Sequence, residues 1–111
     1  MIKIYKKLVR DKIPEIIAQD NEIPKTRILD DKEFVKELFK KLIEESQEAV
    51  KTNGDKQELT KEIGDIYEVL DTLIEYFNLD KQEILDLQNT RRKKRGGFKE
   101  KFFLTETETK E

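Results

Sequence analysis

The chain of 111 residues contains no cysteine and no histidine. Without cysteine, disulfide bonds, thiolate nucleophiles and sulfur-rich zinc sites are excluded. Without histidine, the chain lacks the commonest general base and the usual ligand of zinc, copper and non-haem iron. Any metal ion must therefore be bound by oxygen atoms, which favours Mg²⁺, Mn²⁺ or Ca²⁺.

Long apolar segments are also missing from the sequence. No apolar run approaches the roughly 18–20 residues of a membrane span, and no signal-peptide core is visible. We therefore expect a soluble cytoplasmic protein that does not associate with a membrane. The net charge of −2 does not indicate a strongly charged partner.

Charge is what the chain has in abundance, since 43% of its residues are charged and 35% are hydrophobic. The apolar residues recur at helical spacing, which predicts a folded helical domain rather than a disordered chain. The length fits a single domain over residues 1–111, with a polar tail at 105–111 that we expect to fray. Because a domain of this size buries a modest fraction of its surface, oligomerisation would stabilise it.

The fold class predicted from these patterns is all-α. Helix start and stop signals predict four helices, over residues 12–20, 30–52, 55–77 and 80–94. The N-cap candidates are aspartates: Asp11, Asp30 or Asp31, Asp55 and Asp80. Gly64 lies inside the third predicted helix, where it could allow close approach of another helix or a ligand. The short segments 25–29 and 98–104 are strand-like and could pair as a small appendage.

Two acidic pairs interrupt the apolar stripes of the second and third predicted helices. They are Glu45 with Glu48 and Glu62 with Asp65, and the three-residue spacing puts each pair on one helix face. With 25 acidic residues in the chain, about five such pairs are expected by chance, so the spacing alone carries little weight. The helical register is stronger evidence, because Glu45 and Glu62 occupy positions where the apolar stripes require Leu or Ile.

Four carboxylates aimed at a helical core predict a divalent-cation site. Buried charges are costly unless they are paired or hold a metal, and like charges raise each other's pKa values. Such an ion can neutralise a polyphosphate and acidify a bound water, whose proton Glu44 or Glu48 could accept. The alternative is a solvated or ion-paired face, since Lys41 and Lys61 lie one turn or less from the acids.

Two basic segments flank these helices. The run Arg91–Arg95 precedes Gly96-Gly97, and we favour phosphate binding there, with Arg92, Arg95 and Gly96 as the candidates. A solvated helix C-terminus and a nucleic-acid patch stay open as alternatives. In the segment Lys7–Pro14, composition alone leaves Arg10 and Lys12 as surface charges.

In combination, these segments resemble the MazG-like all-α NTP pyrophosphohydrolases, which include phosphoribosyl-ATP pyrophosphohydrolases and dimeric dUTPases. The metal motif of that group, Glu-Glu-x-x-Glu followed by Glu-x-x-Asp, is matched by Glu44–Glu48 and Glu62–Asp65, with 13 residues between them. Lys7–Pro14 and Arg95–Phe98 resemble a short branch labelled phosphoribosyl-ATP pyrophosphohydrolase-like, and the resemblance covers residues 5–104. Basic residues 91–94 replace the acidic ones that this branch tends to show, which leaves the substrate preference open.

The resemblance implies a four-helix bundle-like MazG fold with short extended N- and C-terminal segments, assembled as a homodimer or higher homo-oligomer. It implies Mg²⁺, with Mn²⁺ as the alternative, held by Glu45, Glu48, Glu62 and Asp65, with Glu44 close by. The implied reaction is hydrolysis of a nucleoside triphosphate, often a non-standard one, or of phosphoribosyl-ATP at the α–β phosphoanhydride, giving a monophosphate and pyrophosphate.

By the same resemblance, Arg10, Lys12 and Arg95 become candidate phosphate contacts. Two functions from other classes remain as alternatives to the enzyme. One is a non-catalytic helical interaction module, and the other is a nucleic-acid binder that uses Arg91–Arg95.

Overall fold

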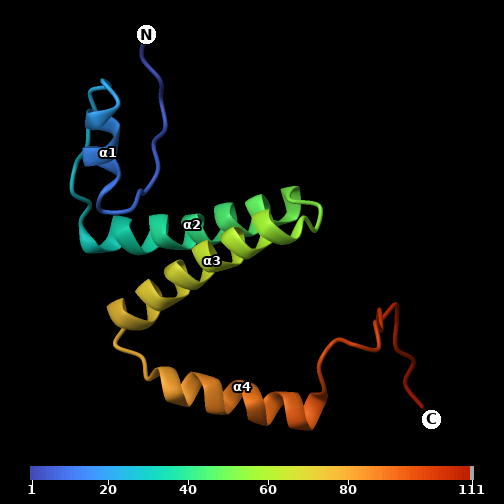
Figure 1. Cartoon of the computed structure of the whole chain (residues 1–111). Helices are drawn as coiled ribbons and strands as arrows, with labels where there is room; N and C mark the ends of the chain where they lie inside the picture. Colours follow the sequence, from blue (N-terminus) through green and yellow to red (C-terminus); the bar gives the residue numbers. More distant parts are fainter. Residues whose placement is uncertain (111) are drawn as a thin grey trace. The chain divides into compact units, whose positions relative to one another are not determined.

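The computed structural model describes residues 1–110, which form four α-helices and no β-strand (Figure 1). The helices are α1 (Ile13–Gln19), α2 (Asp31–Lys51), α3 (Lys56–Tyr76) and α4 (Lys81–Arg95). The all-α prediction is therefore confirmed, and each helix begins and ends within one residue of its predicted bounds. None of the described helices combines the length and apolar character that a bilayer-spanning helix requires.

The predicted pairing of segments 25–29 and 98–104 is wrong, because neither segment is a strand. In the first segment, Ile28 is almost fully exposed and has no sheet to pack on. In the second, the Lys101 N–H donates to the Phe98 carbonyl at 3.1 Å, and Lys101 adopts a φ of 62°. A turn with a left-handed residue interrupts the extended backbone that a strand needs.

Aspartate side chains cap the three longer helices as predicted. The backbone N–H of Glu33 donates to Asp30 at 2.8 Å, and that of Glu58 donates to Asp55 at 3.0 Å. Asp80 accepts from two backbone N–H groups in the first turn of α4, at 2.9 and 3.2 Å. These bonds satisfy N–H groups that have no partner within the helix, so the helix starts are encoded locally.

The prediction that Asp11 caps the first helix is wrong. Helix α1 has Lys12 at its N-cap position, in a helical conformation, and no side chain caps it. The Ile13 N–H donates instead to the Arg10 carbonyl at 3.0 Å. A backbone turn therefore takes the place of the predicted carboxylate cap.

The described chain falls into two compact units, Met1–Phe77 and a second that begins at Asn78. In the first unit, α2 and α3 pack along each other as a helical hairpin (Figure 1). The turn between them contains Asn53 and Gly54, both with positive φ, at 53° and 81°. Such a conformation suits Asn and Gly, which explains the Asn-Gly signal at this point of the sequence.

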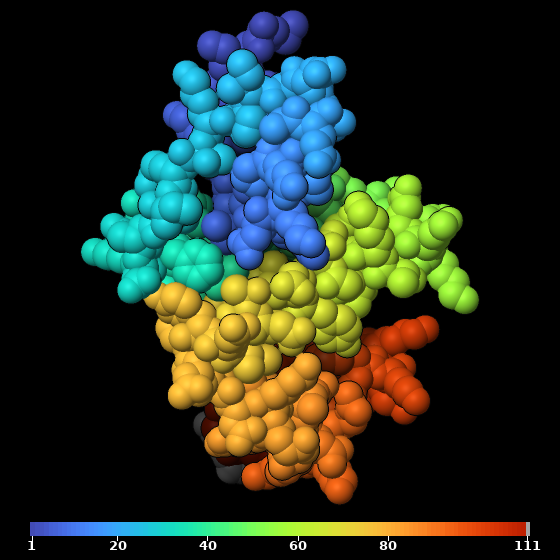
Figure 2. Space-filling view, turned by 60° about the vertical axis from the view of Figure 1, so that its left-hand side comes forward, coloured from blue at the N-terminus to red at the C-terminus, as the bar shows by residue number. Residues whose placement is uncertain are grey.

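The core of the first unit is small. Among the described residues, the buried hydrophobic side chains are Leu38 of α2 with Val69 and Leu73 of α3. Leu8, from the segment that precedes α1, packs against this core. In the space-filling view, part of the N-terminal region, coloured blue, lies against the α2–α3 hairpin (Figure 2). This packing holds the N-terminal segment against the hairpin.

Helix α4 belongs to the second unit and has no buried side chain. It ends at Gly96, whose φ of 85° and N–H bond to the Arg92 carbonyl at 2.7 Å form its C-cap. In α3, a Cβ atom built on Gly64 would meet no heavy atom within 4 Å. No helix of the described chain therefore approaches Gly64 closely, and close approach of a ligand there stays a prediction.

Candidate metal centre

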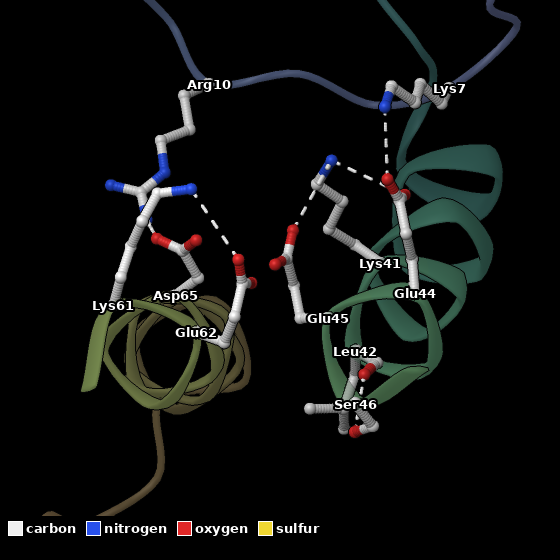
Figure 3. Close-up of polar contacts among 10 residues, drawn as sticks. All are labelled: Lys7, Arg10, Lys41, Leu42, Glu44, Glu45, Ser46, Lys61, Glu62 and Asp65. Carbon is white, nitrogen blue, oxygen red and sulfur yellow. Dashed lines mark hydrogen bonds and ion pairs between the residues drawn. The ribbon is translucent and has the colours of Figure 1, made fainter. Parts of the chain in front are cut away.

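Three carboxylates converge between α2 and α3. Glu45 comes from α2, Glu62 and Asp65 come from α3, and each offers an oxygen within 4.8 Å of the other two (Figure 3). They meet because the hairpin turns the two interrupted apolar stripes toward each other. The structure thus brings together three of the four side chains that the sequence nominated as metal ligands.

These carboxylates lie at the rim of the core. The side chains of Glu45 and Glu62 are 13% and 14% exposed, and that of Asp65 is 29% exposed. Each is therefore partly withdrawn from water, which is unfavourable for a carboxylate without a counter-charge. Each also keeps a path to solvent, through which an ion could enter.

Each of the three carboxylates has one basic partner. The ion pairs are Lys41–Glu45 at 3.8 Å, Lys61–Glu62 at 3.5 Å and Arg10–Asp65 at 2.8 Å (Figure 3). The ion-paired arrangement that we kept open for Lys41 and Lys61 is therefore present in this structure. It does not exclude a metal, because the Lys61 and Arg10 side chains are 75% and 56% exposed, and ion pairs of such exposed groups contribute only about 0–1 kcal/mol.

The position of Glu45 is unfavourable for its charged form. Burial raises its pKa, and Lys41 opposes this effect, while the charge of Asp65 and a hydrogen bond with Glu62 raise the pKa further. The net upward shift means that the ionised form of Glu45 is destabilised in the folded chain. A bound cation would remove this penalty.

Glu44 lies beside the cluster and outside it. Burial pushes its pKa up, but hydrogen bonds from Lys7 and Lys41 and their charges outweigh burial and lower the pKa. The Lys7 Nζ lies 3.0 Å from one carboxylate oxygen and the Lys41 Nζ lies 3.5 Å from the other. Glu44 is thus an ionised carboxylate next to the three converging acids.

Glu48, the fourth nominated ligand, is not in the group of three. Its carboxylate lies 3.4 Å from the Nζ of Lys51 in the same helix, and its side chain is 46% exposed. It does line a hollow of about 320 Å³ together with Glu62. The other residues that line this hollow are Lys51, Thr52, Glu58 and Lys61. Glu48 therefore faces open space next to the cluster.

The remaining nominated residues lie outside the cluster. Lys12 is exposed at the start of α1. Arg92, Arg95 and Gly96 lie at the C-terminal end of α4, in the second unit. Phosphate binding by these four residues stays a prediction.

Sequence reasoning missed two contacts of the N-terminal segment. It gave no partner to Lys7, which contacts Glu44, and from composition it treated Arg10 as a surface charge, although Arg10 contacts Asp65. The available signal was that both basic residues fall in one short segment with Leu8 and Val9 between them. Nothing local in the sequence indicates which carboxylates they meet.

The donor set fits a hard divalent cation. Three carboxylate oxygens with no nitrogen or sulfur ligand match the preferences of Mg²⁺, Mn²⁺ and Ca²⁺. Mg²⁺ usually keeps several waters and takes further oxygens from substrate phosphates, so three partly exposed carboxylates leave room for both.

Comparison of the chain with protein-family models, with curated proteins and with solved structures found no match. The resemblance to the MazG-like group therefore depends on the sequence motifs alone.

Proposed function

We propose that this chain is a Mg²⁺-dependent nucleotide pyrophosphohydrolase of the MazG-like group. In this proposal it cleaves the α–β phosphoanhydride of a nucleoside triphosphate or of phosphoribosyl-ATP, releasing pyrophosphate. The observation that carries the proposal is the convergence of Glu45, Glu62 and Asp65 within 4.8 Å of one another. These residues come from both halves of the acidic motif, and together they offer three oxygen ligands from two helices.

The residues of the chain divide into a binding set and a proton-accepting set. Glu45, Glu62 and Asp65 would hold the ion, and Glu48, which lines a hollow together with Glu62, is the fourth candidate ligand. A bound Mg²⁺ would supply charge neutralisation for the polyphosphate and activation of the attacking water. Glu44 and Glu48 are the candidates for the base, because both are carboxylates beside the cluster.

We further propose that a homodimer or higher homo-oligomer completes a four-helix bundle-like arrangement around the α2–α3 hairpin. The support is the shortage of buried core, which consists of three side chains in the described residues. Large apolar side chains remain exposed on both helices, among them Ile43 at 59% and Tyr67 at 63%. A second copy that covered them would supply the missing apolar burial. The molar mass in solution, measured by light scattering, tests this part.

Pyrophosphate release from a panel of nucleotides, with and without Mg²⁺, tests the activity. The panel contains standard and non-standard nucleoside triphosphates and phosphoribosyl-ATP. We expect Glu62→Gln and Asp65→Asn to lose about 100-fold or more of the Mg²⁺-dependent rate, since each removes a charged ligand.

Glu37→Gln is the matched control for these variants. Glu37 lies partly buried on α2, pairs with Lys40 at 3.5 Å and is outside the cluster, so its replacement should leave the rate unchanged. Absence of Mg²⁺-dependent turnover with every nucleotide would refute the enzyme. Absence of turnover together with weak or absent Mg²⁺ binding would instead support the non-catalytic helical module.

A further inference from the structure

The N-terminal segment contacts both walls of the acidic face. Lys7 donates to Glu44 on α2 at 3.0 Å, and Arg10 donates to Asp65 on α3 at 2.8 Å (Figure 3). Leu8, between the two basic residues, packs against the hydrophobic core. The segment is thus held by one apolar anchor and two basic side chains.

The two basic contacts differ in their relation to the metal centre. Lys7 contacts Glu44, which is outside the three converging carboxylates. Arg10 contacts Asp65, which is one of the three. Arg10 bonds one oxygen of Asp65, so a divalent cation can take the other, but its two positive charges would repel the guanidinium beside it. Metal binding therefore competes with the Arg10 contact and leaves the Lys7 contact in place.

The Arg10 contact is suited to exchange. The Arg10 side chain is 56% exposed, so it can turn into water at low cost, while Leu8 and Lys7 keep its backbone next to the centre. A released guanidinium at this position has five N–H donors in a planar fork, which matches the oxygens of a phosphate group.

We propose that Arg10 is an exchangeable counter-ion of the metal centre. It neutralises Asp65 while no divalent cation is bound, gives up Asp65 to the cation, and then binds a phosphate group of the nucleotide. This inference rests on the proposed function, and it assigns Arg10 two successive partners. The inference predicts that removal of Arg10 raises the affinity for the metal and lowers the affinity for phosphate.

The first experiment measures Mn²⁺ binding to the full chain by electron paramagnetic resonance at low salt. In Arg10→Gln, Mn²⁺ should bind about two- to fivefold more tightly than in the wild type, which is the strength expected of a partly exposed ion pair. Arg27→Gln is the matched control, because Arg27 makes a two-point ion pair with Glu33, at 2.8 and 3.2 Å, outside the three carboxylates. Its Mn²⁺ affinity should equal that of the wild type.

The second experiment measures binding of methylenediphosphonate, a hydrolysis-resistant diphosphate without a base, at saturating Mg²⁺ by calorimetry. We expect Arg10→Gln to bind it about tenfold more weakly, since a charge-assisted contact is lost. Arg27→Gln should again match the wild type. A merely structural role of Arg10 would weaken both metal and diphosphate binding, so tighter Mn²⁺ binding distinguishes the two roles.

A third measurement reports on Arg10 directly and needs no variant that might misfold. During a Mg²⁺ titration of the wild type, the Nε–Hε resonance of Arg10 should shift in proportion to metal binding, while that of Arg27 stays fixed. An unchanged Arg10 resonance at Mg²⁺ saturation would overturn the exchange. Unchanged or weaker Mn²⁺ binding by Arg10→Gln would also overturn the exchange, but it would not contradict the proposed metal site. Failure of the wild type to bind Mn²⁺ at all would refute the metal site and the exchange together.

Discussion

Replacing Glu45 by glutamine should stabilise the metal-free protein and strongly reduce its stabilisation by Mg²⁺. Glutamine keeps the size of the side chain and removes its charge. The charge of Glu45 is unfavourable without a metal, because the side chain is only 13% exposed and has two carboxylates within 4.8 Å. The same charge is needed to hold a divalent cation.

The size of the effect follows from the distances. At an effective dielectric constant of about 20, each of the two like charges at 4.8 Å costs about 3.5 kcal/mol, and Lys41 at 3.8 Å offsets about 4.4 kcal/mol. Arg10 and Lys61 neutralise most of the remaining repulsion from Asp65 and Glu62, respectively. We expect a net gain of about 1 kcal/mol, which raises the Tm of a domain of this size by about 4–8 °C.

Thermal unfolding followed by circular dichroism, with and without millimolar Mg²⁺, measures both effects. The wild type should gain about 2–3 kcal/mol when Mg²⁺ is about 100 times its dissociation constant, and Glu45→Gln should gain much less. Glu37→Gln is again the control, since Glu37 is ion-paired on the same helix outside the cluster. A lower Tm of metal-free Glu45→Gln than of Glu37→Gln would refute the reasoning. A Mg²⁺ response of wild-type size in Glu45→Gln would do so as well.

The remaining predictions concern pH and helix capping. Because burial raises the pKa of Glu45, stability of the metal-free chain should fall as pH rises from 4.5 through the raised value, and Glu45→Gln should lack this fall in urea titrations. The contribution of Glu44 to stability changes with pH in the opposite direction. Burial alone would raise the pKa of Glu44, but the hydrogen bond from Lys7 lowers it. The stabilisation from Glu44 is therefore present above pH 4.5 and is lost as pH falls through the lowered value. Lys7→Gln should reduce that acid-side loss, and an unchanged profile would contradict the assignment. Asp55→Ala should cost about 1 kcal/mol in urea unfolding, because it removes the cap on the Glu58 N–H, and a neutral result would show that this cap is not needed.

The parts of the fold that depend on neighbouring residues could be predicted from the sequence. Asp30, Asp55 and Asp80 cap the helices that they were predicted to cap, because a cap needs only the backbone of the next few residues. The register of Glu45 and Glu62 was readable for the same reason, since helical periodicity fixes which face each residue occupies.

Contacts between distant segments could not be predicted in this way. Asp65 and Glu48 each follow the first acid of their pair by three residues, yet only Asp65 joins the cluster, while Glu48 pairs with Lys51. Spacing gives the face within a helix, but the rotation of one helix against another depends on packing. The contact of Arg10 with Asp65 spans 55 residues and depends on the path of the N-terminal segment.

The short turn between α2 and α3 has a consequence for folding kinetics. All three converging carboxylates belong to one helical hairpin, whereas Lys7 and Arg10 reach their acidic partners across 37 and 55 residues. Contacts at short sequence separation form with less loss of chain entropy and therefore earlier. We expect the acidic cluster to assemble before the N-terminal segment docks on it. A divalent cation present during refolding would then meet the carboxylates before Arg10 does, and would act mainly by accelerating folding rather than by slowing unfolding.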